Sequence, residues 1–301
     1  MTQRTGNTKL RTAVTAAMGG MMLGAGLISA PAMAADGGDK GDVTLAYVEW
    51  SSEVASTNVV RAVLEQQGYN VNISSLSAAA MWQAVAYGDA DAMVSAWLPT
   101  THADYYSKLK DRVENLGANL EGTKLGLVVP EYVSDVSTIS DLEDHADEFN
   151  DKITGIDPGA GIMSKTEDAI DAYGLSNMSL TSGSGATMTA ALDSAIKNKE
   201  PIVVTGWTPH WMFSRYDLKY LDDPKKVYGG AEEIDTIARK GLKQDMPGAY
   251  CILDNFKWTP EQMGEVMLMN RKDGSDPYQD AKKWVQNHED VVNQWTRGCD
   301  S

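Results

Sequence analysis

The feature that most constrains this chain is a pattern of strands and helices that occurs twice and ends both times in Trp-x-Pro. Apolar runs of strand length alternate with amphipathic runs of helix length in residues 43–97 and again in residues 152–207. The last run of each half carries a tryptophan shortly before a proline, Trp97 in "DAMVSAWLP" and Trp207 in "IVVTGWTP". Alternating strands and helices are typical of α/β folds with parallel-type sheets. We therefore expect two similar α/β lobes with a ligand cleft between them.

The remaining segments predict how the two halves are joined and covered. Residues 123–133 are expected to be extended and to cross from one lobe to the other, and residues 234–242 are expected to form the return crossing. Residues 259–271 and 277–295 have the periodicity of helices, and the first of them begins with the helix-start signal Thr-Pro-Glu.

The first 34 residues have the composition of a secretory signal peptide. A basic start without acidic residues precedes an apolar stretch over residues 13–30, and Ala-Met-Ala at 32–34 is a small-x-small cleavage site. We expect cleavage near Ala34 and export of a soluble mature chain to the periplasm. An uncleaved membrane anchor is the alternative. No cysteine lies near the cleavage point to carry a lipid anchor.

The charge of the chain argues against several classes of partner. Its formal net charge is −16, so nucleic acid and anionic lipid surfaces would be repelled. Beyond the leader, no apolar segment approaches the length of a membrane span. The net charge does not describe the ligand, because it is a property of the surface.

Cys251 and Cys299 are the only cysteines of the chain. In an oxidising compartment, two cysteines in one region most simply form a disulfide, and two buried thiols are the alternative.

Catalysis has little support in the sequence. The motifs G-x-S-x-G and H-E-x-x-H are absent, neither cysteine has an evident base, and the four histidines are scattered. We therefore expect no catalytic residue, no metal site and no cofactor. An enzyme acting on a quaternary amine is the weaker hypothesis.

The aromatic residues of the chain are mostly tryptophan and tyrosine. The chain has eight Trp and only three Phe. If aromatic residues served only to fill the core, Phe would be sufficient. Trp50, Trp97 and Trp207 lie at the carboxyl ends of predicted strands, where ligands of α/β sheets bind. A quaternary ammonium donates no ordinary hydrogen bond, and indole faces attract it through their quadrupole. We expect these rings to form an open box, with packing in the core or at its rim as the alternative. Trp82, Trp258, Trp284 and Trp295 are expected in the core. Trp211 could lie either in the core or at the cleft.

A second pattern would suit the carboxylate of a zwitterion. In "DPGAGIMSKTEDA" (157–169) a Gly-rich turn leads into a predicted helix, whose first backbone N–H groups are free to bind an anion. A plain tight turn is the alternative, and the Gly-Lys-Ser/Thr of a nucleotide loop is absent. His102 follows closely after Trp97 and could reach the same carboxylate with a ring N–H, although a lone histidine is more often structural or simply exposed.

Five segments of the chain carry a resemblance to a known family: "YVEWSSEVASTNVV", "SAWLPTTHADYY", "LGLVVPEYV", "GIDPGAGIM" and "VTGWTPHWMFSRYDLKYLDDPK". They resemble the glycine betaine-binding proteins of osmoprotectant ABC importers (the OpuAC-like group), and the resemblance covers essentially all of the mature chain. The two halves stand in the non-permuted order, with the "YVEW" half first. The resemblance implies a type II-like, two-lobed periplasmic binding protein, with lobe 1 at 42–128 and 240–301 and lobe 2 at 129–239.

The resemblance also implies the residues of the site. The trimethylammonium group would lie among Trp50, Trp97 and Trp207. The carboxylate would bind the His102 side chain and, in addition, the backbone N–H groups of Gly161 and Ile162. The implied protein is a monomer that delivers its ligand to a membrane permease of an ABC importer. Glycine betaine is the first expected ligand; proline betaine, dimethylsulfoniopropionate, choline, or a role as a ligand-sensing module for a membrane receptor are the alternatives.

Overall fold

The computed structural model describes residues 40–299, so the predicted signal peptide lies outside the described residues. The first half contains the alternating elements expected from the sequence: β1 (Asp42–Tyr47), α1 (Ser51–Gln66), β2 (Asn70–Ser75), α2 (Ala78–Tyr87) and β3 (Ala92–Leu98), followed by α3 (Ala103–Leu109). Helix α2 stops because Gly88 takes up a left-handed conformation (φ 83°), which glycine adopts without strain.

The second half repeats this order with shorter strands. Its elements are β5 (Lys152–Thr154), α4 (Gly161–Tyr173), β6 (Ser179–Thr181), α5 (Gly185–Asn198) and β7 (Val204–Thr208). Short pieces precede and follow it: η1 (Ile139–Leu142), η2 (Ala146–Phe149), α6 (Met212–Arg215) and β8 (Leu218–Tyr220). The side chain of Ser184 caps α5 by accepting the backbone N–H of Thr187, which satisfies one free donor of the first turn.

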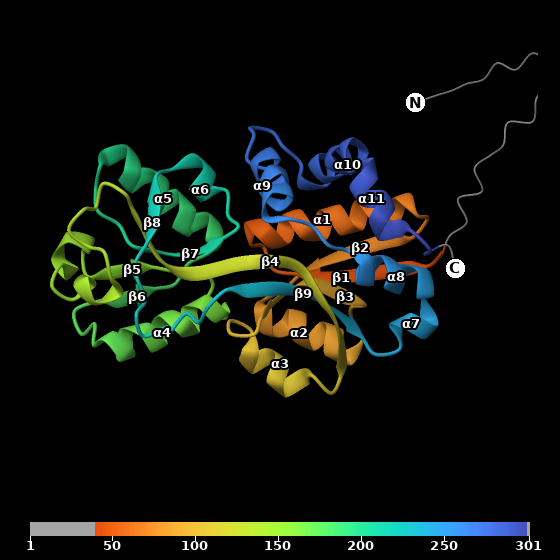
Figure 1. Ribbon diagram of the computed structural model, residues 1–301, viewed down its shortest axis with the longest axis horizontal. Helices are drawn as coiled ribbons and strands as arrows, with labels where there is room; N and C mark the ends of the chain where they lie inside the picture. Colours follow the sequence, from red (N-terminus) through yellow and green to blue (C-terminus); the bar gives the residue numbers. More distant parts are fainter. Residues whose placement is uncertain (1–39, 300–301) are drawn as a thin grey trace, which may run out of the picture. The chain divides into compact units, whose positions relative to one another are not determined.

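Two long strands connect the halves. Strands β4 (Val113–Pro130) and β9 (Glu232–Arg239) pair with each other, and β4 continues into the second half, where it pairs with β7 and β8. The strand order is β2-β1-β3-β9-β4-β7-β5-β6, with β8 on β4. Figure 1 shows β4 running from the strands of one half to those of the other.

The sheet is mixed, and the parallel pairs expected from alternating strands and helices lie inside each half. Within each half the pairs β1–β2, β1–β3, β5–β6 and β5–β7 are parallel. The pairs that involve the connecting strands, β3–β9, β4–β9, β4–β7 and β4–β8, are antiparallel. Within a half, a helix returns the chain to the same end of the sheet, so the next strand can pair in parallel. The connecting strands β4 and β9 run in the opposite direction to the strands with which they pair.

The C-terminal part consists of helices packed on the first half: α7 (Leu242–Asp245), α8 (Pro247–Asn255), α9 (Pro260–Met269), α10 (Pro277–Asn287) and α11 (Glu289–Thr296). The single helix expected at 277–295 is broken at His288. The ring Nδ1 of His288 lies 2.9 Å from the carbonyl oxygen of Trp284, which the backbone N–H of His288 would use in a continuous helix. That N–H instead donates to the carbonyl of Val285.

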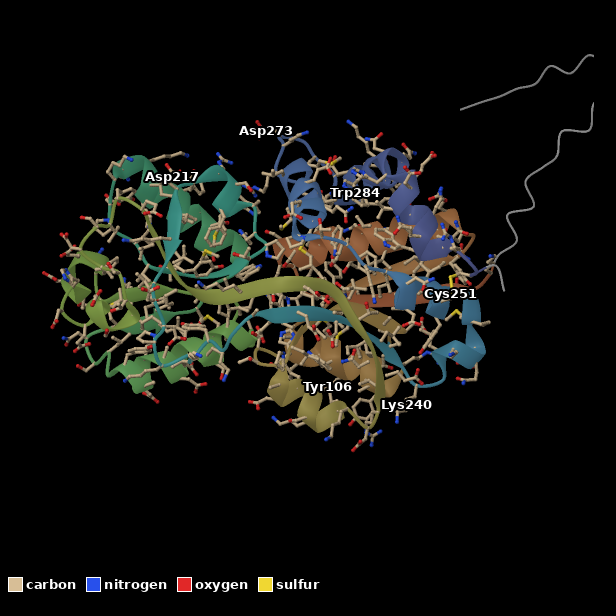
Figure 2. All side chains as sticks on the ribbon, in the orientation of Figure 1. Tyr106, Asp217, Lys240, Cys251, Asp273 and Trp284 are labelled. Atoms are coloured by element: carbon tan, nitrogen blue, oxygen red, sulfur yellow. A yellow bond between two sulfur atoms is a disulfide. The ribbon has the colours of Figure 1, made fainter. Side chains whose placement is uncertain are left out.

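The hydrophobic core extends through both halves, and the disulfide lies in the C-terminal part. Trp82, Trp258, Trp284 and Trp295 are all buried, as the sequence predicts. Cys251 in α8 forms a disulfide with Cys299, with 5.5 Å between the Cα atoms. The labels of Figure 2 place Cys251 at this helix and Trp284 among the C-terminal helices.

Candidate functional site

All six residues that the sequence predicts for ligand binding lie around one cavity. Its wall consists of tryptophans, one histidine, the start of a helix and several small or apolar residues: Trp50, Trp97, Thr101, His102, Leu125, Ile156, Ala160, Gly161, Ile162 and Trp207. About 290 Å³ is free of protein atoms, a volume that includes solvent at the mouth. The wall is mostly apolar with a few polar groups, as is typical of a site for a small molecule.

The ends of three strands bring the indoles to the cavity. Trp97 lies in β3 and Trp207 in β7, and Trp50 caps the N-terminus of α1 soon after β1. The Leu98–Pro99 and Thr208–Pro209 bonds, which follow two of these tryptophans, are both cis. The three indoles are only 3–6% exposed. Ring surfaces that line a cavity in this way are desolvated, and an indole attracts a cation most strongly under that condition.

His102 is fixed on the backbone of Trp97. The N–H of Trp97 donates to Nδ1 of His102 over 3.1 Å. Because Nδ1 is an acceptor, the proton of the neutral imidazole lies on Nε2. Nε2 is buried and has no hydrogen-bond partner within residues 40–299. A buried donor without an acceptor costs about 1–3 kcal/mol, and an acceptor on a ligand would remove this cost.

Burial keeps His102 uncharged. His102 is 1% exposed. Burial lowers its pKa to about 3, although a smaller effect of the Ser95 backbone acts in the opposite direction. Desolvation disfavours the charged form of a histidine, so the ring stays neutral at ordinary pH. His102 therefore offers an anion a hydrogen bond and not a positive charge.

The start of α4 adds two more donors to the same cavity. The helix begins at Gly161 after its N-cap Ala160, and the N–H groups of Gly161 and Ile162 have no backbone acceptor in the described part of the chain. A helix N-terminus carries roughly half a positive charge and is a ready site for a carboxylate. Together with Nε2 of His102, the cavity offers three donors and no fixed cation in its wall.

Two of the three indole N–H groups are bound by carboxylates. Nε1 of Trp97 donates to Oε1 of Glu53 over 2.9 Å, and Nε1 of Trp50 donates to Oδ2 of Asp157 over 3.1 Å. Nε1 of Trp207 is buried and has no partner among the described residues. The bond to Asp157 joins the two halves of the chain, so one ring of the site is fixed by both halves.

The halves also pack tightly beside the cavity. A Cβ atom on Gly161 would lie only 2.2 Å from the carbonyl oxygen of Thr101, so no larger residue fits there without a shift of the backbone. Next to this contact, the hydroxyl of Tyr105 donates to the carbonyl of Gly159 over 2.8 Å. The first half therefore contacts the start of α4 directly.

Trp211, whose role the sequence left open, does not line this cavity. It is 3% exposed, and its Nε1 donates to the hydroxyl of Ser51 over 3.2 Å. The guanidinium of Arg271 lies 4.6 Å from the centre of its ring. Trp211 therefore forms a separate contact between the halves.

Six residues of the site or its support were missed by the sequence analysis: Thr101, Leu125, Ile156, Ala160, Glu53 and Asp157. Asp157 and Ala160 belong to the Gly-rich turn that the sequence did single out. Glu53 had a weaker signal, because it shares a face of α1 with Ser56 and Val60, which are both buried.

The OpuAC family, described as the substrate binding domain of ABC-type glycine betaine transport systems, matches residues 41–287. The chain belongs to this family. Lactococcal OpuAC, solved in a closed-liganded conformation with glycine betaine, is 46% identical with a TM-score of 0.81, covering 85% of this chain and 100% of its own. A ProX protein from Borrelia burgdorferi is 43% identical with a TM-score of 0.83, covering 85% of this chain and 97% of its own.

A curated relative matches this chain over a shorter length. GbuC of Listeria monocytogenes, a glycine betaine/carnitine transport binding protein, is 57% identical over 160 residues. The match covers 52% of this chain, which spans about half (53%) of that relative's length. Together with the solved structures, family membership establishes the two-lobed α/β fold of a binding protein for ABC transport.

The described residues show neither a membrane span nor a metal site. Within residues 40–299, no helix combines the length and the apolar character needed to cross a bilayer. In the same range, no group of three or more His, Cys, Asp or Glu side chains is arranged to hold a metal ion.

Proposed function

We propose that this protein captures glycine betaine, or a closely related onium zwitterion, in the periplasm and presents it to the permease of an ABC importer for osmoprotection. One observation supports this more than any other: a single small cavity combines three buried indoles with three hydrogen-bond donors that lack acceptors. An onium group needs the first feature and a carboxylate needs the second.

The ligand would span the cavity with its two ends in different surroundings. The trimethylammonium group would lie against Trp50, Trp97 and Trp207, where it gains cation–π attraction without giving up hydrogen bonds. The carboxylate would accept the Nε2–H of His102 and the N–H groups at the start of α4. Each lobe contributes to both ends, so binding would favour closure of the lobes about the connecting strands.

The wider setting is part of the same proposal. The protein would act as a monomer without catalytic activity, after export directed by residues 1–34. The division into lobe 1 (42–128 and 240–301) and lobe 2 (129–239) remains a prediction. This division assigns β9 to lobe 2, although β9 pairs with β3 and β4 beside the first lobe.

The choice among ligands follows from the donors. Glycine betaine, proline betaine and dimethylsulfoniopropionate each have an onium group and a carboxylate on a short linker. Choline has a neutral hydroxyl group where the betaines have a carboxylate, so it would leave the anion site at His102 and the start of α4 unused and is a weaker candidate. A role as a sensing module for a membrane receptor would use the same cavity and differ only in the docking partner.

A thermal-shift panel tests the proposal. The mature protein is heated with glycine betaine, proline betaine, dimethylsulfoniopropionate, choline or glycine, because a ligand that binds only the folded state raises Tm. We expect the betaines to raise Tm, choline to raise it less, and glycine to leave it unchanged. A Tm that responds to none of the onium compounds would end the proposal.

A further inference from the structure

A buried carboxyl group lies at the N–H edge of the Trp97 indole. Glu53 belongs to the first turn of α1, and its residue is 0% exposed. Oε1 accepts the indole N–H over 2.9 Å and also lies 3.4 Å from the hydroxyl of Ser52. Oε2 is buried without a hydrogen-bond partner among the described residues.

No positive side chain compensates this carboxyl group. Within residues 40–299, the ion pairs do not include Glu53, and the groups that act on it are Ser52, Ser95 and Trp97. Burial raises its pKa to about 7, because the protein around it stabilises the charge poorly. An anchor for the indole alone could be a neutral amide, which would avoid burying an unpaired charge.

We propose that Glu53 makes the cavity prefer a cationic head group to a neutral one of the same shape. It acts as a positioning residue through Trp97, because it holds the indole N–H and places a negative charge beside the ring. The inference rests on the proposed function, in which the onium group lies against Trp97. The bound cation then supplies the positive charge that the protein itself lacks at this point.

Two physical effects would act in the same direction. A carboxylate that accepts the indole N–H increases the negative potential of the ring face, which strengthens its attraction for a cation. The carboxylate also attracts the cation directly, and this attraction is stronger in a desolvated cavity than in water. Neither effect acts on an uncharged group.

The test compares two ligands that differ only in charge at one atom. Glycine betaine carries a trimethylammonium group, and 3,3-dimethylbutyrate has carbon in place of the nitrogen with the same methyl groups and carboxylate. Affinities are measured by calorimetry at pH 8.5 for the wild type and for Glu53→Gln, which keeps an oxygen acceptor for the indole. We expect the substitution to weaken glycine betaine at least about tenfold and to change 3,3-dimethylbutyrate less than about threefold.

Glu49→Gln is the matched control. It removes the same charge from an exposed residue close by in the sequence, so the ratio of the two affinities should stay at the wild-type value. Equal losses for both ligands in Glu53→Gln would show that Glu53 only supports the ring, and would overturn the inference. Failure of the wild type to bind glycine betaine would instead overturn the proposed function.

A second measurement needs no variant. Protonation of Glu53 removes its charge, so the preference of the wild type for glycine betaine over 3,3-dimethylbutyrate should be smaller at pH 5.5 than at pH 8.5. Ser52 on α1 and Ser95 and Trp97 on β3 do not titrate in this range, and His102 stays neutral because burial lowers its pKa to about 3. The same preference at both pH values would contradict the inference.

Discussion

Trp97 and His102 are joined by two hydrogen bonds that run in opposite directions. The backbone N–H of Trp97 donates to Nδ1 of His102 over 3.1 Å, and the backbone N–H of His102 donates to the carbonyl of Trp97 over 2.8 Å. A residue proposed to hold the cationic end of the ligand thus fixes the tautomer of a residue proposed to hold its anionic end. One short segment of the chain therefore positions a residue proposed for each end of the ligand.

Replacing His102 should affect ligands according to whether they have a carboxylate. His102→Ala removes the Nε2–H donor, and a hydrogen bond to a charged group is worth about 1.5–3 kcal/mol, which corresponds to roughly 10–150-fold in affinity. We expect a loss of this size for glycine betaine and a much smaller one for choline, measured by calorimetry. His145→Ala is the control, because His145 pairs with Glu148 outside the cavity. Equal losses for the two ligands would argue against this role of His102.

Gly161 should tolerate no side chain in the closed arrangement. A Cβ atom would meet the carbonyl oxygen of Thr101 at 2.2 Å, whereas alanine is compatible with the helix itself. We expect Gly161→Ala to fold with an unchanged Tm and to bind glycine betaine at least about tenfold more weakly, since the halves cannot approach fully. Gly185→Ala is a close match: Gly185 is also the first residue of a helix, and its Cβ would meet no atom within 4 Å. Similar affinities for both variants would show that this contact does not limit closure.

His210 should make the fold sensitive to acid. Burial, with a smaller effect of the Arg271 charge, lowers the pKa of His210 to about 3 from an ordinary value of 6.5. Because the unfolded chain binds this proton first, His210 contributes stability that is present above pH 6.5 and is lost as the pH falls towards 3. Between pH 8 and pH 5 the loss amounts to about 2 kcal/mol for one such group.

His210→Asn tests this sign directly. The amide oxygen can replace Nδ1, which accepts the backbone N–H of Met212, but asparagine does not titrate. Chemical denaturation at pH 8 and pH 5 should show a smaller loss of unfolding free energy in the variant, by about 2 kcal/mol. An equal loss in both proteins would mean that His210 is not held neutral.

The contact between Arg271 and Trp211 should slow the release of ligand. It joins the loop after α9 to the start of α6, away from the cavity, and a partly exposed cation–π pair is worth about 0.5–1 kcal/mol. We expect Arg271→Ala to raise the dissociation rate of glycine betaine roughly two- to fivefold, followed by stopped-flow tryptophan fluorescence. Lys272→Ala should leave the rate unchanged, because within residues 40–299 the hydrogen bonds of Lys272 are made by its backbone. Equal rates in all three proteins would assign no closing role to this contact.

Local sequence signals predicted the elements of each half. Alternating apolar runs, glycine stops and the start of α4 are properties of neighbouring residues, so the order of strands and helices could be read directly. The antiparallel pairing of β4 and β9 could not be predicted in this way, because it depends on which distant segments meet. The break at His288 depends on one ring nitrogen competing for the carbonyl of Trp284.

The same distinction applies to the site. Trp97, Trp207 and the turn before Gly161 have recognisable local patterns, and the cavity brings them together. Glu53 and Asp157 act on indoles that are 44 and 107 positions away, so no spacing in the sequence relates them to the site. The close contact of Thr101 with Gly161 likewise exists only once the two halves meet.

The central claim is that the indoles hold the onium group, and calorimetry of glycine betaine binding to Trp207→Ala tests it most directly. Nε1 of Trp207 has no partner among the described residues, so this substitution breaks no hydrogen bond of the protein. We predict a folded variant that binds about 30-fold more weakly, as expected for the loss of about 2 kcal/mol from one desolvated indole. A folded variant with the affinity of the wild type would contradict the account.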